Sequence, residues 1–195
     1  KKIALILGDN IFHGTNLKNF LWEGINNQQG ALIFAYNVKN IGNYGAITLD
    51  SDNNPIKLEE KPRIPKNSYA VPGLYFFDET VLKKSKEIKP SKRGELEITD
   101  INKIYLREKQ LKVKIMGRGM SWFDIGEIDS FNEASNYVRA IQNRQGLSIG
   151  CPEEIAWRNK WISSEELLNS LNLNSRSQYI QYIRELVKKS EVINV

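Results

Sequence analysis

The sequence predicts an α/β fold with a partly parallel sheet, followed by a smaller helical segment. Two observations carry this prediction: a strand–helix–strand pattern within the first 40 residues, and the loss of strand patterns after residue 150. The composition is that of a globular protein, with 41% hydrophobic and 26% charged residues. We therefore expect residues 1–150 to form one domain and residues 151–195 a helical appendage.

The first domain begins with an apolar run from Ile3 to Leu7, which predicts a strand covered on both faces in a parallel sheet. Asn16 is placed to cap a helix whose apolar residues recur at helical spacing as far as Ile25. A second apolar strand is expected from Ala31 to Val38. Because a doubly covered strand is seldom the first element of such a sheet, we expect the chain to be truncated before its first strand–helix unit.

The middle of the chain alternates between strand and helix patterns. It predicts a hairpin of residues 46–50 and 55–59, and a strand from Tyr69 to Phe77 in which Pro72 and Gly73 indicate an edge, a bulge or an approaching ligand. The remaining expectations are helices at about 79–88, 97–109 and 129–145, strands at 111–116 and 121–124, and helices after 151 with a polar break at 172–177.

Charge and cysteine content narrow the functional classes. The net charge of +5 favours anionic ligands, but the 28 basic residues are spread among 23 acidic ones, which disfavours a nucleic-acid surface. The single cysteine, Cys151, is expected to be a buried apolar residue in a protein of the reducing cytoplasm. No apolar run reaches the roughly 20 residues that span a bilayer, and no signal peptide is expected.

Two aspartates are candidate ligands of a hard cation. Asp9 follows the first apolar strand, and Asp124 ends a short apolar strand before Ile125 and Gly126. Carboxylates at the ends of strands reach the edge where open α/β sheets bind ligands, and Mg²⁺ is commonly held by one or two carboxylates together with substrate phosphates. The alternative is that each aspartate caps a turn or a helix, a role that Asp129 could also fill.

A carboxylate beside a cation suggests a sugar-phosphate site. Glu60 could accept hydrogen bonds from sugar hydroxyls while Lys61 meets a phosphate, and Glu59 must point to the opposite face of the strand. Arg93 offers planar paired donors for the same phosphate. The alternatives are a solvated hairpin end for the first pair, and helix-start acids for Glu95 and the acids that follow it.

Several other chemistries lack their residues. His13 is the only histidine and has no cluster of cysteines or histidines to join, so neither zinc binding nor a Ser/His/Asp triad is expected. No Walker A or GxGxxG motif occurs. The candidate Asp-x-Asp motif of a glycosyltransferase, Asp50-Ser51-Asp52, falls in a polar hairpin turn.

Taken together, the motifs resemble the sugar nucleotidylyltransferases, and among them the glucose-1-phosphate thymidylyltransferases. The resemblance runs from about residue 3 to 162, and more weakly to the end of the chain. It rests on LGDN, YG, LEEKP, YAVPGLYFFD, KPSKRGELEITDINKIYL, MGRGMSWFDIG, EASNYV and QGLSIGCPEEIAWR. The fold it implies is a Rossmann-like mixed sheet of the nucleotidyltransferase type, here incomplete at its N-terminus, with a C-terminal helical segment.

The resemblance also implies roles for particular residues. Asp9 and Asp124 match the catalytic, Mg²⁺-binding aspartates. The positions of the sugar-phosphate site are matched by Gly45, Glu60, Lys61, Val71, Tyr75, Arg93 and Trp122. A second, regulatory nucleotide-sugar site is matched by His13, Gly14, Arg118, Glu154, Ile155 and Arg158. The family's C-terminal helices build a homotetramer, which makes a homo-oligomer the expected assembly.

The activity implied is Mg²⁺-dependent transfer of a deoxythymidylyl group from dTTP to glucose 1-phosphate, giving dTDP-glucose and pyrophosphate. This reaction belongs to dTDP-rhamnose and polysaccharide biosynthesis in the cytoplasm, and dTDP-sugars are the implied regulatory ligands. The family's glycine-rich triphosphate loop is not found in these 195 residues, so we expect the chain alone to be inactive. The alternative is a non-catalytic sugar-nucleotide-binding or assembly module.

Overall fold

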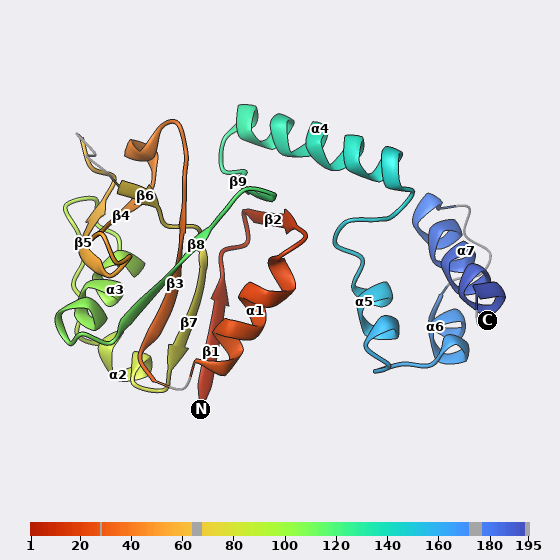
Figure 1. Ribbon diagram of the computed structural model, residues 1–195, viewed down its shortest axis with the longest axis horizontal. Coiled ribbons are helices and arrows are strands. Elements are labelled where there is room, and N and C mark those ends of the chain that lie inside the picture. Colours follow the sequence, from red (N-terminus) through yellow and green to blue (C-terminus); the bar gives the residue numbers. More distant parts are fainter. Residues whose placement is uncertain (28, 64–67, 172–176, 194–195) are drawn as a thin grey trace. The chain divides into compact units, whose positions relative to one another are not determined.

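The computed structural model describes residues 1–27, 29–63, 68–171 and 177–193 (Figure 1). The chain forms two compact units, an N-terminal unit of residues 1–134 and a C-terminal unit of residues 135–195. The division falls inside helix α4 (Ile128–Gln145), whereas the sequence analysis placed it at residue 150. Helix α4 is continuous, so the chain passes from one unit to the next within a helix and not at the loop that follows it.

Within the described residues, the strands of the N-terminal unit form one large and one small sheet. The large sheet has the order β1-β7-β3-β6-β4-β5, with β8 paired to β3, and the small sheet pairs β2 with β9. The strands are β1 (Lys2–Ile6), β2 (Asn10–Gly14), β3 (Ala31–Tyr36), β4 (Gly45–Leu49), β5 (Pro55–Glu60), β6 (Ser68–Ala70), β7 (Leu74–Asp78), β8 (Leu111–Met116) and β9 (Met120–Asp124).

The large sheet is mixed, as predicted. β3 and β8 run parallel over the six pairs from Ala31–Leu111 to Tyr36–Met116, whereas β7 lies antiparallel to both β1 and β3. The helices of the unit are α1 (Leu17–Asn26), α2 (Val81–Lys84), α3 (Ile98–Arg107) and a 3₁₀ turn, η1 (Ile41–Asn43). The expected α/β fold class is confirmed.

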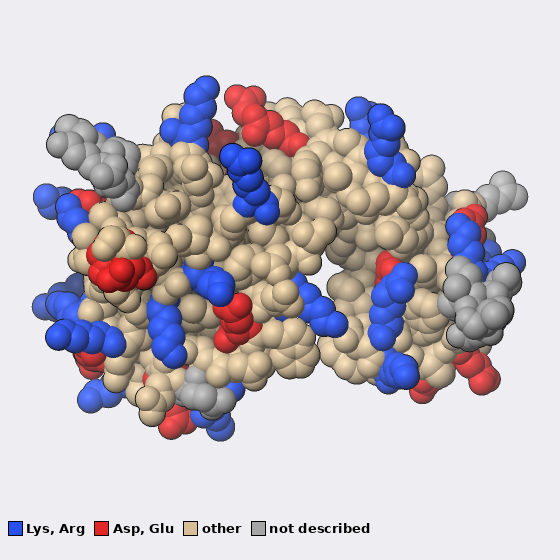
Figure 2. Space-filling view, viewed as in Figure 1, with Lys and Arg blue, Asp and Glu red and all other residues tan. Residues whose placement is uncertain are grey.

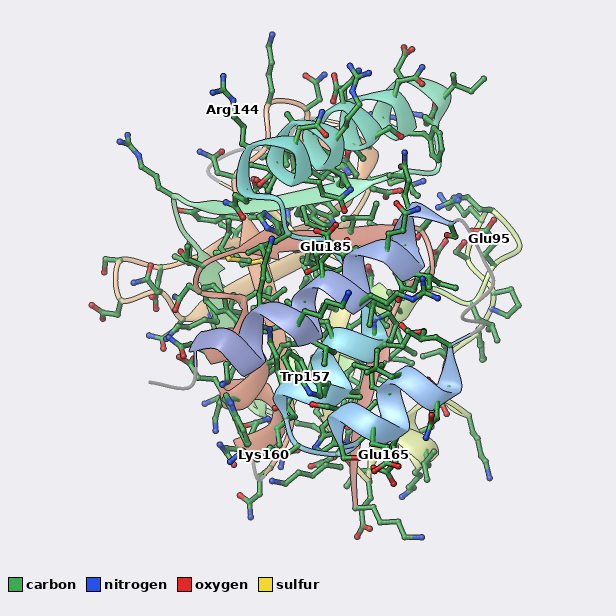
Figure 3. All side chains as sticks on the ribbon, turned by 90° about the vertical axis from the view of Figure 1, so that its right-hand side faces the viewer. Glu95, Arg144, Trp157, Lys160, Glu165 and Glu185 are labelled. Atoms are coloured by element: carbon green, nitrogen blue, oxygen red, sulfur yellow. The ribbon has the colours of Figure 1, made fainter. Side chains whose placement is uncertain are left out.

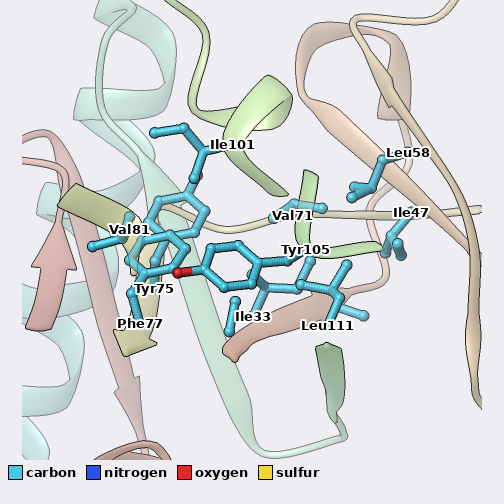
Figure 4. Close-up of a cluster of buried hydrophobic side chains, with 12 residues drawn as sticks. Ile33, Ile47, Leu58, Val71, Tyr75, Phe77, Val81, Ile101, Tyr105 and Leu111 are labelled. Atoms are coloured by element: carbon cyan, nitrogen blue, oxygen red, sulfur yellow. The ribbon is translucent and has the colours of Figure 1, made fainter. Parts of the chain in front are cut away.

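Alternation along β3 explains why the sheet has a core on each face. Ala31, Ile33 and Ala35 belong to one buried cluster with residues of α3, while Leu32 and Phe34 belong to another with Phe20 of α1. On the α3 side, the fully buried ring of Tyr105 lies among side chains from the sheet (Figure 4). Its hydroxyl donates to Asp78 Oδ1 at 2.9 Å, so its one polar atom is satisfied at the rim.

The expectation that the first strand is covered on both faces is wrong for the described residues. β1 pairs only with β7 and forms the edge of the sheet, and Leu5, Ile6 and Leu7 are 36%, 59% and 40% exposed. An apolar run specifies a strand but not its neighbours, so the sequence pattern could not distinguish a central strand from an exposed edge.

The expectation of one strand from Tyr69 to Phe77 is also wrong. The segment forms β6 and β7, with Pro72 and Gly73 between them. Proline has no N–H for a ladder, and here β6 pairs with β4 while β7 pairs with β1 and β3. The helix expected at 79–88 is present only as the single turn α2, and α3 and α4 lie close to their expected bounds.

Helices alone make up the regular structure described in the C-terminal unit, as predicted. After α4 come α5 (Pro152–Arg158), α6 (Ser164–Ser170) and α7 (Gln178–Ile193), around a core of Cys151, Leu167, Ile183 and Val187. The indole of Trp157 on α5 donates to Ser164 Oγ at 3.0 Å, which ties α5 to α6 (Figure 3). Cys151 is buried, as expected, and most of the predicted break at 172–177 lies outside the described residues.

The charged surface is mixed. On the face drawn in Figure 2, basic side chains lie in small groups with acidic side chains among them. Among the residues that the structure describes, no helix combines the length and apolar character needed to cross a membrane.

Candidate active site

A cavity of about 350 Å³ in the N-terminal unit gathers the residues that the sequence predicted for metal and substrate. It lies where β2, β5, β9 and the segment before β7 meet the start of α3. All of these predicted residues line it: Asp9, Gly45, Glu60, Lys61, Val71, Tyr75, Arg93, Trp122 and Asp124. The structure therefore brings together positions up to 115 residues apart in the chain, while their individual roles stay predictions.

The small sheet makes neighbours of the two aspartates. β2 lies antiparallel to β9 with Asn10 opposite Asp124, and the N–H of Ile125 donates to the carbonyl oxygen of Asp9 at 2.8 Å. Each aspartate is therefore fixed at a strand end by backbone bonds. Because both stand at the same end of one two-stranded sheet, their carboxylates face a common space.

Gly126 leaves that space open. A Cβ atom at this position would lie 3.3 Å from Asp124 Oδ1 and 3.7 Å from Asp9 Oδ2. Two carboxylate oxygens around an unfilled space suit a hard cation such as Mg²⁺. Among the described residues no group of three or more His, Cys, Asp or Glu side chains could hold a metal, so the remaining ligands would be water and substrate oxygens.

Glu60 is oriented at the opposite wall of the cavity. It ends β5, and its Oε2 accepts a hydrogen bond of 2.5 Å from the hydroxyl of Thr99, which is buried in the first turn of α3. Glu59 does not line the cavity and pairs with Lys57 at 2.9 Å, as strand alternation requires. The other oxygen of Glu60, Oε1, lies 3.9 Å from Arg93 Nη1.

Two cations meet this wall. Arg93 lies among carboxylates, with Nη2 at 2.9 Å from Glu95 and Nη1 at 3.6 Å from Glu97 and 3.9 Å from Glu60. Lys61 has a backbone φ of +42°, in the left-handed region that non-glycine residues seldom adopt. The cost of that conformation is consistent with a functional position, and Lys61 lines the cavity.

Aromatic rings form the floor. The indole of Trp122 meets the rings of Tyr36 and Tyr44 edge-on, with centroids 5.7 and 4.9 Å apart. Burial raises the pKa of Tyr75, and the negative charges of Glu60 and Asp124 raise it further. Burial also raises the pKa of Tyr44, and the negative charges of Asp124, Glu133 and Glu127 raise it further. Both tyrosines thus remain neutral donors beside the carboxylates.

An adjoining cavity of about 720 Å³ shares Asp9, Asp124 and Lys61 and continues toward the start of α4. Its further acidic lining comes from Glu127, Asp129 and Glu133. The aspartates therefore stand between a compartment that carries Glu60 and Arg93 and a larger one that carries Glu127, Asp129 and Glu133.

Asn10 and Thr99 are site residues to which the sequence analysis gave no individual role. Both are buried polar side chains that line the cavity and bond to predicted site residues. Asn10 stood in the LGDN motif directly after Asp9, and Thr99 at the start of a helix, where a cap is the ordinary expectation. Only the tertiary contacts distinguish a residue that orients a site side chain from an ordinary helix cap or motif neighbour.

The predicted regulatory residues fall into two sets. In the N-terminal unit, His13 and Gly14 end β2, and Arg118 lies in the turn between β8 and β9. A side chain on Gly14 would collide with the carbonyl oxygen of Gly119, at 2.4 Å, so this turn packs against the end of β2. These three residues therefore share one end of the small sheet.

The other set lies on α5 of the C-terminal unit. Glu154 Oε1 accepts from Arg158 Nε at 2.7 Å, and Glu154 Oε2 accepts from the hydroxyl of Tyr182, while Ile155 is 51% exposed. Glu154 is therefore already paired within its own unit. The regulatory site itself stays a prediction.

The Asp50-Ser51-Asp52 motif forms a turn. Asp50 Oδ1 accepts from the N–H groups of Asp52 and Asn54 at 2.9 and 2.8 Å. The bond from the Asn54 backbone is the main cause that lowers the pKa of Asp50. Its carboxylate holds the β4–β5 hairpin, which argues against a glycosyltransferase metal site there.

Comparisons with known proteins agree with this geometry. A model of the family described as Nucleotidyl transferase matches residues 1–140. Curated relatives named glucose-1-phosphate thymidylyltransferase are 44% identical in Neisseria meningitidis serogroup A / serotype 4A and 46% identical in Mycolicibacterium smegmatis, each over 187 residues. Each alignment covers 96% of this chain and 65% of the relative, so the chain spans about 65% of the length of these relatives.

Solved structures show a similar fold. A provisionally named glucose-1-phosphate thymidylyltransferase from Bacillus anthracis, in complex with a sucrose, is 38% identical with a TM-score of 0.63, covering 71% of this chain and 55% of that one. A UDP-glucose pyrophosphorylase complexed with UDP-glucose is 23% identical with a TM-score of 0.60, covering 70% and 55%, and supports the fold alone.

Proposed function

We propose, from the premise that this chain belongs to the nucleotidyl transferase family, that it forms the sugar-phosphate- and metal-binding part of a glucose-1-phosphate thymidylyltransferase. The observation that carries the proposal is the single cavity in which Asp9 and Asp124 stand beside Glu60, Lys61 and Arg93. The names of its relatives support the same substrate class.

In the proposed reaction a phosphate oxygen of glucose 1-phosphate attacks the α-phosphorus of dTTP. The bond between that phosphorus and the oxygen leading to the β-phosphate breaks, and pyrophosphate leaves with the electron pair. The attacking and attacked groups are both anionic, so the protein's task is to hold them together and to offset their repulsion.

The chain's own residues divide this task. Lys61 and Arg93 hold the attacking phosphate by charge and by directed N–H donors. Glu60, oriented by Thr99, accepts hydrogen bonds from sugar hydroxyls, while Tyr75, Val71 and Trp122 enclose the ring. Asp9 and Asp124 would hold Mg²⁺, which when bound neutralises phosphate charge.

Binding measured on this chain tests the proposal. Titration calorimetry with glucose 1-phosphate in the presence of Mn²⁺ should show binding that Asp124→Asn weakens by on the order of tenfold or more, because one of two carboxylate ligands is lost. Glu127→Gln, which changes an acid that lines only the adjoining cavity, is the matched control. Binding equal in the two variants, or none by the wild-type chain, would count against the site.

Turnover gives a second measurement. Because these 195 residues contain no glycine-rich triphosphate loop, we expect the chain to bind sugar phosphate without forming dTDP-glucose from added dTTP. Product formation at an ordinary enzymatic rate would show that the chain is sufficient for the reaction.

We infer from the same family relation that the intact enzyme is a cytoplasmic homo-oligomer. Its mass in solution would check the oligomeric state.

A further inference from the structure

One buried polar side chain next to the metal carboxylate has no role in the proposed reaction. Asn10 is 9% exposed and opens β2, directly after Asp9. Burying an amide is costly unless its hydrogen bonds are made, so its partners indicate what it does. Its side-chain hydrogen bonds go to Asp9, Gly73 and Trp122, which line the same cavity.

The amide oxygen of Asn10 joins two other segments. It accepts from Trp122 Nε1 at 2.6 Å and from the N–H of Gly73 at 2.9 Å. A Cβ on Gly73 would lie 2.7 Å from this oxygen, so the approach requires glycine. Gly73 O also accepts from the N–H of Leu7 at 2.9 Å, which locks the segment before β7 against the end of β1.

The amide nitrogen acts on the carboxylate. Asn10 Nδ2 donates to Asp9 Oδ1 at 2.9 Å, and Asp9 Oδ2 is the oxygen that faces the open space beside Gly126. A carboxylate with no such bond rotates about its terminal torsion. The bond therefore fixes the plane of the carboxylate, so that its second oxygen points into the space that Asp124 also borders.

We propose that Asn10 is a positioning residue that couples the metal and sugar sides of the site. Its oxygen fixes the Trp122 ring and the Gly73 turn, and its N–H turns Asp9 toward the space shared with Asp124. The inference rests on the proposed function, because it assigns Asn10 a role in a metal-binding sugar-phosphate site.

Nuclear magnetic resonance of the wild-type chain tests the clamp without any metal. The indole N–H of Trp122, assigned by its loss in Trp122→Phe, should exchange slowly with solvent and should exchange at least roughly tenfold faster in Asn10→Ala. Asn10→Asp keeps an acceptor oxygen, so the indole should stay protected there. Equal exchange in wild type and Asn10→Ala would overturn the oxygen's role.

The nitrogen's role has its own readout. The side-chain amide resonances of Asn10 should shift in Asp9→Ala and stay in place in Asp129→Ala, which removes an acid that lines only the adjoining cavity. This comparison needs no Asn10 variant, so it decides the question even if Asn10→Ala does not fold. Asn10 side-chain amide resonances that do not shift in Asp9→Ala would contradict the proposal.

Metal affinity then measures the consequence. In the presence of glucose 1-phosphate, Asn10→Ala should bind Mn²⁺ on the order of tenfold more weakly, as loss of a residue behind a ligand typically does. Asn19→Ala, on α1, should stay within about twofold of wild type. Folded Asn10→Ala with unchanged affinity refutes the positioning role. A wild-type chain that does not bind Mn²⁺ refutes the proposed function instead, and the metal-free resonances then decide the clamp alone.

Discussion

The two units use the same kind of side chain in opposite ways. In the N-terminal unit, Asp9 Oδ2 and Asp124 Oδ1 border an open space beside Gly126, where a Cβ atom would lie 3.7 Å from the first oxygen and 3.3 Å from the second. On α5, Glu154 is 9% exposed and both of its oxygens accept hydrogen bonds, from Arg158 and Tyr182. The aspartates, although held by Asn10 and by the Gly126 N–H, therefore still face an open space, whereas both oxygens of Glu154 are paired within the protein.

The surroundings of Glu154 extend the contrast. Tyr179 donates to Glu153, and Cys151 Sγ donates to the hydroxyl of Tyr179 at 3.2 Å, so a second hydrogen-bonded chain runs beside the first. These bonds connect α5 to α7 across the unit's apolar core. Polar groups that are buried and fully paired stabilise a unit, whereas two carboxylates that border one open space repel each other until a cation binds between them.

The largest expected effect tests this contrast through stability. Glu154→Ala leaves Tyr182 and Arg158 without their acceptor and should lower the free energy of unfolding of the C-terminal unit by about 2–4 kcal/mol. Asp124→Ala should change that of the N-terminal unit by less than about 1 kcal/mol, because it also removes a charge that repels Asp9. Hydrogen exchange read separately on α7 and on β3 measures each unit.

Glu165→Ala is the matched control for that experiment. Glu165 lies in the first turn of α6 and is exposed, so its loss should cost only a few tenths of a kcal/mol. If Asp124→Ala destabilised its unit as strongly as Glu154→Ala destabilises the other, the division into available and used carboxylates would be wrong.

A smaller effect is expected when the open space beside Gly126 is filled and both aspartate charges are kept. Gly126→Ala places a methyl group between the two aspartates and should weaken Mn²⁺ binding by about tenfold while leaving thermal stability equal or slightly higher. Gly117→Ala is the control, because a Cβ there meets nothing within 4 Å. A Gly126→Ala chain with wild-type Mn²⁺ affinity would place the cation elsewhere.

Local patterns predicted elements well but not their neighbours. The hairpin of β4 and β5, strand β8 and helix α4 follow from alternation and helical spacing. Strand β2 was not predicted, because Asn10–Gly14 is short and its partner β9 lies more than 100 residues away. The exposure of β1 escaped prediction for the same reason, since only the sheet order makes it an edge.

The site shows the same limit. The residues matched by resemblance to the metal and sugar-phosphate positions all line one cavity, because strand ends and a helix start converge there, whereas the predicted regulatory residues do not line it. The sequence could not show that Thr99 bonds to Glu60 or that Asn10 bonds to Trp122, because those contacts join residues 39 and 112 positions apart. The sequence motifs therefore identified the side chains of the site, and the structure added the hydrogen bonds between them.

The smallest expected effect concerns pH in the C-terminal unit. Burial, and then the bond to Glu154, raise the pKa of Tyr182 from 10.0 to about 12. A raised acid pKa means that the stabilisation is complete below about pH 10 and is lost as the pH rises toward 12. Tyr182→Phe removes the bond and should lower stability by about 1 kcal/mol at pH 8.

The difference between wild type and Tyr182→Phe should therefore shrink between pH 10 and 12, because the wild-type hydroxyl loses its proton there. Urea unfolding of both chains at pH 8, 10 and 12, followed on α7, measures it. Tyr179, whose pKa burial also raises, is present in both chains and cancels in the difference. A gap that stays constant across this window would mean that the Tyr182 hydroxyl does not hold Glu154, which would leave Arg158 as the partner of that carboxylate.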